Sequence, residues 1–254
     1  MCGTCGCNVK PDKATDSAQD RKNQAESIEV LESLLQANDV QAAHNREHFV
    51  RHGVLAINLM SSPGAGKTSL LEATIDELGQ DFRIAVVEGD LETENDAARI
   101  RKKGVPAVQI STGTACHLDA DMVHTALHEL DLDAVDILFI ENVGNLVCPA
   151  SFDLGQHLNV ALLSTPEGHD KPAKYPVMFR AADLVVLSKS DLLGILDDFD
   201  PAEARACIRR LATGPNVIEL SAKSGAGIGP WSDWICSEFA AVTTVEPPAQ
   251  AAHT

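Results

Sequence analysis

The chain has 254 residues, enough for one large α/β domain with appended segments, and a core of that size needs no disulfide bonds to be stable. Its net charge is −17, from 37 acidic and 20 basic residues, which disfavours a nucleic-acid partner because phosphate backbones are bound by clustered lysine and arginine. The sequence has no basic region followed by an apolar run at its start, and no apolar stretch of the ~20 residues that cross a bilayer. We therefore expect a cytoplasmic protein with no membrane partner.

Three closely spaced cysteines open the sequence. Cys2, Cys5 and Cys7 are separated mainly by glycine, so the chain can fold back and direct three thiolates at one ion. Such a soft, anionic site suits Ni²⁺, Cu⁺ or Zn²⁺. A redox dithiol and part of an iron–sulfur site are the alternatives, but a redox CxxC normally starts a helix inside a folded domain. A metal site is the favoured interpretation.

Composition divides the chain into three predicted segments. Residues 1–24 form a cysteine-containing metal-binding segment whose polar second part, residues 10–24, is expected to be a flexible tether. Residues 25–242 form the main domain, and residues 243–254 are expected to be a disordered tail.

The main domain is predicted to begin with an amphipathic helix from Ala25 to about Val50, because apolar residues recur there at helical spacing. Later histidines recur every four residues but have no carboxylate or cysteine among them on that face. We interpret these as a solvated surface rather than as metal ligands, and the same holds for a second pair further on. They are His44, His48 and His52, and then His124 and His128.

Short apolar runs alternate with helical patterns along the rest of the domain. The expected strands are 54–60, 83–87, 105–110, 136–140, 160–163, 184–187 and 217–220, and a helix is expected from Lys67 to Leu78. This alternation predicts a three-layer, doubly wound α/β fold with a mostly parallel sheet. In such folds ligands bind beyond the carboxyl ends of the strands.

A phosphate-binding loop follows the first expected strand. The sequence from Ser61 to Thr68, SSPGAGKT, has the pattern of a P-loop NTPase except that Ser61 replaces the first glycine. The glycines let the backbone approach the phosphates, Lys67 reaches the β- and γ-phosphates, and the Thr68 hydroxyl coordinates Mg²⁺. The nucleotide-binding residues expected here are Gly64, Ala65, Gly66, Lys67, Thr68 and Ser69.

Two later loops favour guanine over adenine. Ser188-Lys189-Ser190-Asp191 resembles the NKxD element of GTPases, and the Asp191 carboxylate can accept two hydrogen bonds from guanine but none from adenine. Ser188 in place of asparagine leaves the bracing role of that amide open. Ser221-Ala222-Lys223 resembles the SAK element behind the base. GTP is the favoured nucleotide and ATP the alternative.

Acidic residues stand at the ends of two expected strands. Asp90 follows the second strand and Glu141 ends another, so both are expected at the phosphate end of the sheet. One of them would bind Mg²⁺ directly or through water, and Gly144 could donate its N–H to the γ-phosphate. We take Lys67, Asp90 and Glu141 as candidate catalytic residues, with Thr68 and Asp90 as candidate Mg²⁺ ligands.

Taken together, these motifs resemble HypB, the family of GTPases that help to install nickel in [NiFe]-hydrogenase. The resemblance rests on CxxCGC, NLMSSPGAGKTSLL, EGDLETENDAARI, TGTACHLDADMV and ENVGNLVCPASFDLG, which together cover most of the chain. It implies a SIMIBI-class P-loop fold, a nucleotide-dependent homodimer, and an inner metal site formed by Cys116, His117 and Cys148. The His-rich tract that some members carry is missing, so a nickel reservoir is not supported.

The chemistry of these three residues agrees with a ligand role. Cys116 and His117 follow an expected strand, and Cys148 lies just after Gly144, so a loop that responds to nucleotide could move one ligand. Cys207 and Cys236 have no such neighbours and are read as core or surface thiols.

The sequence thus predicts a slow GTPase that delivers Ni²⁺, with GTP and Mg²⁺ as cofactors and Ni²⁺ or Zn²⁺ at the inner site. The resemblance implies a HypA-type metallochaperone and a hydrogenase large-subunit precursor as partners. Three alternatives remain: a urease-type accessory GTPase, a small-molecule kinase that uses the P-loop, and a passive metal buffer.

Overall fold

The structure is a computed structural model that describes residues 18–90, 94–196, 198–211 and 216–244, with side chains from residue 32 onward. Two compact units are distinguished, residues 1–37 and residues 38–254. In the first unit the described residues are helical and belong to α1, Ala18–His52. This helix starts before the predicted Ala25, so part of the expected tether is helical.

The second unit contains a single sheet of seven parallel strands, and all seven predicted strands are present. Their order in the sheet is β3-β2-β4-β1-β5-β6-β7, and every neighbouring pair is parallel. The strands are β1 Leu55–Ser61, β2 Ile84–Asp90, β3 Ala107–Ser111, β4 Ile137–Glu141, β5 Leu158–Ser164, β6 Leu184–Ser188 and β7 Asn216–Glu219.

Helices connect the strands, as parallel pairing requires. They are α2 Lys67–Leu78, α3 Asn95–Lys102, α4 Ala120–Leu127, α5 Lys171–Lys174, α6 Pro176–Ala181, α7 Pro201–Leu211 and α8 Ile228–Thr243, with 3₁₀ turns at Leu132–Ala134, Cys148–Ser151, Thr165–Glu167 and Ser190–Leu192. The predicted helix Lys67–Leu78 is confirmed as α2. Of the predicted tail, Thr243 belongs to α8 and residues 245–254 lie outside the described residues.

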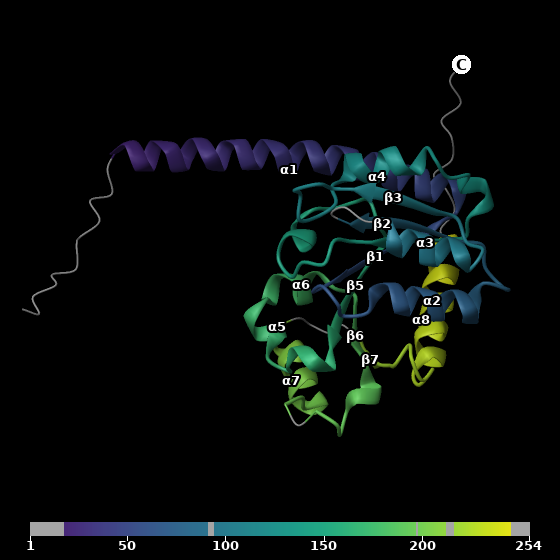
Figure 1. The fold of residues 1–254 in the computed structure, drawn as a ribbon. Coiled ribbons are helices and arrows are strands. Elements are labelled where there is room, and N and C mark those ends of the chain that lie inside the picture. Colours follow the sequence, from purple (N-terminus) through teal and green to yellow (C-terminus); the bar gives the residue numbers. More distant parts are fainter. Residues whose placement is uncertain (1–17, 91–93, 197, 212–215, 245–254) are drawn as a thin grey trace, which may run out of the picture. The chain divides into compact units, whose positions relative to one another are not determined.

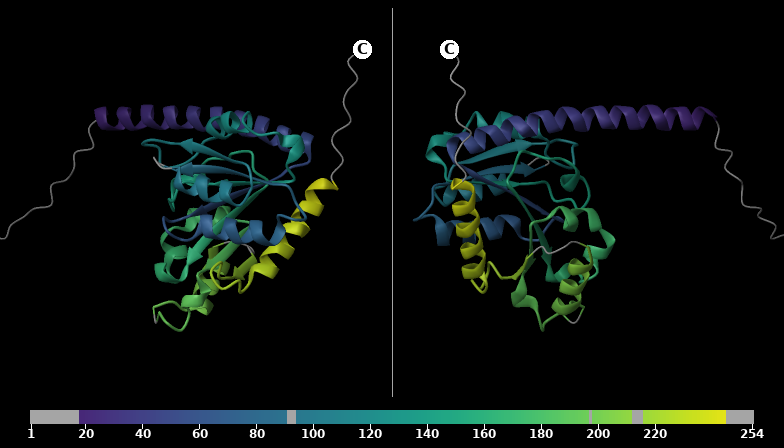
Figure 2. Two further views of the ribbon diagram at one scale, coloured as in Figure 1. Left: turned by 45° about the vertical axis from the view of Figure 1, so that its right-hand side comes forward. Right: turned by 180° about the vertical axis from the view of Figure 1, so that it is seen from behind.

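Both faces of the sheet are covered, because successive residues of the central strand β1 pack into hydrophobic clusters on opposite faces. Leu55, Ile57 and Leu59 pack with α2, α3 and α8. Ala56 packs on the opposite face with the second half of α1 and with α4, while Met60 packs with α6 and α7. Figure 1 and Figure 2 show α5, α6 and α7 as a separate group of helices. The predicted three-layer, doubly wound architecture is confirmed.

The position of β1 between β4 and β5 places the P-loop at the centre of the carboxyl edge of the sheet. The loops that follow β2, β4, β6 and β7 open at the same edge because the strands are parallel. Among the helices that the structure describes, none is both long enough and apolar enough to cross a membrane.

Candidate functional site

The P-loop encloses a cavity of about 440 Å³ at the carboxyl ends of β1, β2 and β4. Gly66 adopts a left-handed conformation with φ 99° immediately before α2, which a side chain would disfavour. Ser61, in place of the usual glycine, is fully buried at the end of β1 and has no positive φ. The Lys67 ammonium donates to the Ser61 hydroxyl at 3.2 Å, so the substituted serine serves as an internal partner of the phosphate-loop lysine.

The loop that follows β6 braces the P-loop from the side. The Ser188 hydroxyl donates to the Ala65 carbonyl at 2.8 Å, and the Lys189 ammonium donates to the Gly64 carbonyl at 2.6 Å. Ser188 therefore holds the phosphate loop in place of the asparagine amide of an NKxD element. Lys189 is the single non-glycine residue with a positive φ in the described part of the chain, at 59°.

A second cavity of about 240 Å³ adjoins the first and shares Gly66, Ser69 and Lys189 with it. Its mouth contains Asp191, whose carboxylate accepts a hydrogen bond from the buried Ser221 hydroxyl at 2.6 Å. The base-binding residues predicted from the sequence all line this cavity: Lys189, Asp191, Ser221, Ala222 and Lys223. The predicted phosphate residues Gly64, Gly66, Lys67, Thr68, Ser69, Asp90, Glu141 and Gly144 line the first cavity.

Two buried acids, Glu88 of β2 and Glu141 of β4, are direct cross-strand partners under the P-loop. Glu141 accepts a hydrogen bond from the Thr68 hydroxyl at 3.1 Å and lies 3.8 Å from the Lys67 ammonium. One oxygen of each acid, Glu88 Oε1 and Glu141 Oε2, is buried without a hydrogen-bond partner. Unpartnered carboxylate oxygens beside a threonine hydroxyl are the donor set that a hard divalent cation such as Mg²⁺ takes.

Burial, together with the negative charge of Glu141, raises the pKa of Glu88 to about 10, and burial also raises the pKa of Glu141. Because the folded protein binds the Glu88 proton more tightly than the unfolded chain, the contribution of Glu88 to the free energy of unfolding falls as pH rises between about 4.5 and about 10. We expect the metal-free protein, kept in chelator, to unfold at a lower urea concentration at pH 9 than at pH 6.

The Glu88→Gln variant should lose much of this difference in urea midpoint, since glutamine carries no titrating proton. Glu77→Gln, at an exposed position of α2, is the matched control and should unfold like the wild type at both pH values. Equal pH dependence in the Glu88→Gln variant and the wild type would contradict the assignment of the buried proton to Glu88.

Asn142 and Gly144, just after β4, connect the phosphate cavity with the neighbouring loops. The buried Asn142 side chain accepts a hydrogen bond from the Leu118 backbone N–H at 3.1 Å. Gly144 lies so close to the P-loop that a Cβ atom there would come within 2.8 Å of the Pro63 Cα. The segment after β4 is thus in contact with the P-loop and with the loop that precedes α4.

Cys116, His117 and Cys148 come together from two of these loops. The Cys116 thiol donates to the Cys148 sulfur at 3.0 Å, the His117 Nδ1 lies 3.8 Å from the Cys116 sulfur, and the His117 ring stacks on Phe152. The three ligand atoms lie within 4.8 Å of one another and are half-buried. Burial lowers the pKa of His117, which favours the neutral imidazole that binds metals. Two thiols and one imidazole form a donor set for Ni²⁺ or Zn²⁺.

The remaining cysteines lie outside the two cavities and the inner cysteine–histidine group, or outside the described residues. Cys2, Cys5 and Cys7 lie outside the described residues. Cys207 and Cys236 are half-buried free thiols of α7 and α8.

Four residues with polar or charged side chains line the phosphate cavity without having been predicted as site residues from the sequence: Glu88, Asp96, Arg99 and Asn142. Arg99 forms ion pairs with Glu72 at 2.6 Å and with Asp96 at 3.0 Å. Of these four, Glu88 alone had a signal in the sequence, since it is an acid that directly follows the apolar run from Ile84 to Val87.

Comparison with known proteins identifies the family. The model of the CobW/HypB/UreG nucleotide-binding domain matches residues 55–217. "Hydrogenase maturation factor HypB" of Azotobacter vinelandii is 54% identical over 213 residues, which cover 84% of this chain and 70% of the relative. The chain belongs to the HypB family. The resemblance seen in the sequence is confirmed.

Solved HypB structures share the fold. HypB of Helicobacter pylori, crystallised in complex with nickel, has 40% sequence identity and a TM-score of 0.78, and the match covers 86% of this chain and 99% of that one. HypB of Archaeoglobus fulgidus has 38% identity and a TM-score of 0.76 over 81% of this chain and 100% of that one. The P-loop NTPase architecture of this HypB family member is therefore shared with solved relatives.

Proposed function

We propose that this chain is a GTP-hydrolysing nickel metallochaperone that delivers Ni²⁺ for the maturation of [NiFe]-hydrogenase, and that nucleotide state controls its metal affinity. The observation that carries this proposal is the pair of hydrogen bonds that joins the metal-ligand loop to the phosphate cavity. Membership of the HypB family and the names of its relatives, "hydrogenase maturation factor", support the recipient.

In the proposed reaction, Lys67 binds the β- and γ-phosphates while Thr68 and Asp90 hold Mg²⁺ directly or through water. The buried, unpartnered oxygens of Glu88 and Glu141 support a cation at this place. Mg²⁺ would neutralise charge that develops on the γ-phosphate, and the Gly144 N–H would contact that phosphate. Glu141 is the candidate for orienting the attacking water, because it lies between Thr68 and Lys67. Turnover is expected to be slow without a partner.

Guanine would occupy the second cavity, with Asp191 as its specific acceptor. The carboxylate can accept hydrogen bonds from the guanine N1–H and 2-amino group, a pair of donors that adenine lacks. The Ser221 hydroxyl at 2.6 Å from Asp191 supports this role because it fixes the orientation of the carboxylate before nucleotide binds.

The proposed cargo site consists of Cys116, His117 and Cys148, with Ni²⁺ or Zn²⁺ as the ion. Cys2, Cys5 and Cys7 are proposed to hold Ni²⁺ in a second site. At the inner site, metal binding would release one proton from each of the Cys116 and Cys148 thiols, since thiolates are the ligands. The hydrogen bond that the Cys148 thiol shares with Cys116, together with burial, raises the pKa of Cys148, so metal affinity should increase with pH.

Both ends of the loop that carries Cys116 and His117 are hydrogen-bonded to the phosphate cavity. At one end the Thr112 N–H donates to the Asp90 carbonyl at 3.0 Å, and at the other the Leu118 N–H donates to Asn142 at 3.1 Å. Cys148 follows Gly144 by four residues on the segment that contacts the P-loop. A movement of this segment on GTP binding would shift Cys148 relative to Cys116. Nucleotide binding and metal binding would then both depend on the position of the same segment.

The proposed assembly is a homodimer that works with a HypA-type metallochaperone and a hydrogenase large-subunit precursor in the cytoplasm. The net charge of −17 favours metal cations and disfavours nucleic acid as a partner. Helicobacter relatives are named "hydrogenase/urease maturation factor", one of them 42% identical over 225 residues, so a urease recipient is a second candidate. Nickel transfer to a hydrogenase precursor or to metal-free urease distinguishes the two recipients.

Nickel affinity measured in two nucleotide states tests the coupling. In a Cys2/Cys5/Cys7→Ser background, which leaves the inner site as the cysteine site, we expect Ni²⁺ affinity to differ at least fivefold between GDP and a non-hydrolysable GTP analogue, within the usual range of allosteric coupling. Asn142→Ala should reduce this difference, because the Leu118 N–H then loses its link to β4.

Asn216→Ala, at an exposed position of the edge strand β7, is the matched control and should keep the nucleotide dependence. An inner site whose nickel affinity is the same with GDP, with the analogue and in Lys67→Ala would refute the coupling and leave a passive metal buffer. GTP that yields no free phosphate unless an acceptor is phosphorylated would instead favour a kinase.

A further inference from the structure

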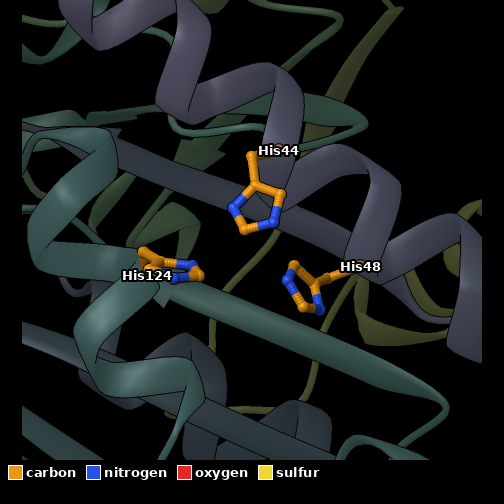
Figure 3. A group of neighbouring side chains, drawn as sticks. All are labelled: His44, His48 and His124. Atoms are coloured by element: carbon orange, nitrogen blue, oxygen red, sulfur yellow. The ribbon is translucent and has the colours of Figure 1, made fainter.

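Three histidines from two helices point toward a common centre on the surface of the second unit. His44 and His48 lie one turn apart on α1, and His124 lies on α4 (Figure 3). Their ring centroids are 4.6, 4.9 and 5.7 Å apart, and one ring nitrogen of each lies within 4.8 Å of the others. We refer to these three residues as the histidine cluster. The sequence favours a solvated surface because no carboxylate or cysteine lies among these histidines, and it does not show that His124 lies beside His44 and His48.

Hydrogen bonds between α1 and α4 fix the position of the histidine cluster. The Ala120 N–H donates to Asn38 Oδ1 at 2.9 Å, and Asn45 Nδ2 donates to the Ala120 carbonyl at 2.8 Å. The start of α4 is also capped by Asp119, which accepts a hydrogen bond from the Met122 N–H at 2.8 Å. The two helices are therefore joined at the first turn of α4, one turn before His124.

Asn45 also sets the protonation of the His124 ring. Its Nδ2 atom donates to the carbonyls of Ala120 and Leu154, so Oδ1 is the atom that faces His124 Nδ1, at 3.1 Å. A carbonyl oxygen can only accept, and His124 Nδ1 must then carry the proton. The lone pair of the neutral ring lies on Nε2. Ligand histidines in metal sites are commonly oriented in this way by an oxygen behind the ring.

His128 extends the cluster by one further ring. Its Nε2 lies 3.3 Å from Nε2 of His124, and the two ring centroids are 4.7 Å apart. Ligand atoms of a tetrahedral ion with bonds of ~2.0–2.1 Å are about 3.3–3.4 Å apart, so this pair already has the spacing of two ligands. His44 and His128 are exposed, and their rings can turn to close the remaining distance.

Electrostatics favour the neutral, ligating form of these rings. Burial, and then the neighbouring His44 and Arg51, lower the pKa of His48. Burial and the rings of His128 and His44 lower the pKa of His124, against a smaller opposite effect of Asp121. Imidazole nitrogens without carboxylate ligands suit Zn²⁺, Ni²⁺, Co²⁺ or Cu²⁺ and not Mg²⁺ or Ca²⁺.

We propose that His44, His48 and His124, with His128 as a fourth ligand, form a binding site for a divalent transition metal such as Zn²⁺ or Ni²⁺. This site uses helices α1 and α4, whereas Cys116, His117 and Cys148 lie in loops. It does not depend on the proposed function, because it requires neither nucleotide nor thiolate. The fold thus carries an all-imidazole site in addition to its cysteine ligands.

Metal binding by the full-length chain without its candidate cysteine ligands tests the site. In a variant with Cys2, Cys5, Cys7, Cys116 and Cys148 all replaced by serine, titration with Zn²⁺ in the absence of nucleotide should show one bound equivalent. Co²⁺ should give the visible absorption of a low-symmetry site without thiolate-to-cobalt charge transfer. Zero bound equivalents of either ion would overturn the proposal.

Substitutions in the same background assign the ligands. His44→Gln/His124→Gln should abolish the bound equivalent. His44→Gln alone replaces an exposed side chain and leaves the core intact. It should weaken Zn²⁺ binding by more than the roughly 10–100-fold loss that is typical when a residue behind a metal ligand is replaced. The matched control, His169→Gln/His253→Gln, removes two histidines that belong neither to the histidine cluster nor to the candidate inner site, and it should retain the equivalent. Retention by the cluster variants, or loss in the control, would overturn the proposal, provided circular dichroism shows every variant folded.

Discussion

Lys67→Ala should lower the rate of GTP hydrolysis by about 10²-fold or more, the usual effect of removing one group that stabilises transition-state charge. The Lys67 ammonium is buried at the floor of the phosphate cavity, 3.2 Å from the Ser61 hydroxyl and 3.8 Å from Glu141. Its loss removes the positive charge proposed to face the β- and γ-phosphates and leaves Glu141 without its nearest cation. Phosphate release at saturating GTP and Mg²⁺ measures the effect.

The exposed Lys103 supplies the control, because its ammonium pairs with Asp76 on the surface at 2.6 Å. Lys103→Ala should hydrolyse GTP at the wild-type rate, since a surface ion pair contributes little. A Lys67→Ala protein that folds normally and hydrolyses GTP within threefold of the wild-type rate would exclude the P-loop cavity as the site of hydrolysis.

Asp191→Asn is expected to lower GTP affinity by about 10²–10⁴-fold, since two hydrogen bonds to a charged acceptor contribute roughly 1.5–3 kcal/mol each. The same variant should gain affinity for xanthosine triphosphate. Xanthine carries a carbonyl where guanine carries its 2-amino group, and the asparagine amide can donate a hydrogen bond to that carbonyl but not to the amino group. Competition of each nucleotide with a fluorescent GDP analogue measures both changes.

The exposed Asp81, in the turn after α2, provides a change of the same chemical kind away from the base cavity. Asp81→Asn should bind GTP like the wild type. If Asp191→Asn kept its preference for GTP over xanthosine triphosphate, the second cavity would not be the base site. Failure of this prediction alone would still leave phosphate binding at Lys67 intact.

Much of the fold could be predicted because local patterns specify it. The apolar runs predicted all seven strands, and the glycine-rich turn between β1 and α2 does line a cavity, which is the proposed phosphate site. The predicted start of α1 was wrong because residues 18–24 lack the apolar periodicity from which the helix was predicted. A polar sequence can still be helical where it continues a helix that packs further along the chain.

Contacts between segments far apart in the chain could not be predicted in the same way. Glu88 faces Glu141 because β4 lies between β1 and β2 in the sheet. The sequences of these strands do not specify that order. The approach of His124 to His48 depends on how α4 packs on α1. In both cases the contact depends on which distant segments are brought face to face. The spacing of apolar residues along the chain carries no information about this.

The bracing of the P-loop by the segment after β6 has a consequence for engineering. Ser188 and Lys189 belong to the proposed base-binding loop, yet their side chains donate hydrogen bonds to the carbonyls of Ala65 and Gly64. A redesign of nucleotide preference that exchanges this loop would therefore also disturb the cradle for the phosphates. We therefore expect base selectivity and turnover to change together, and a transplanted specificity loop would need to retain the serine and the lysine.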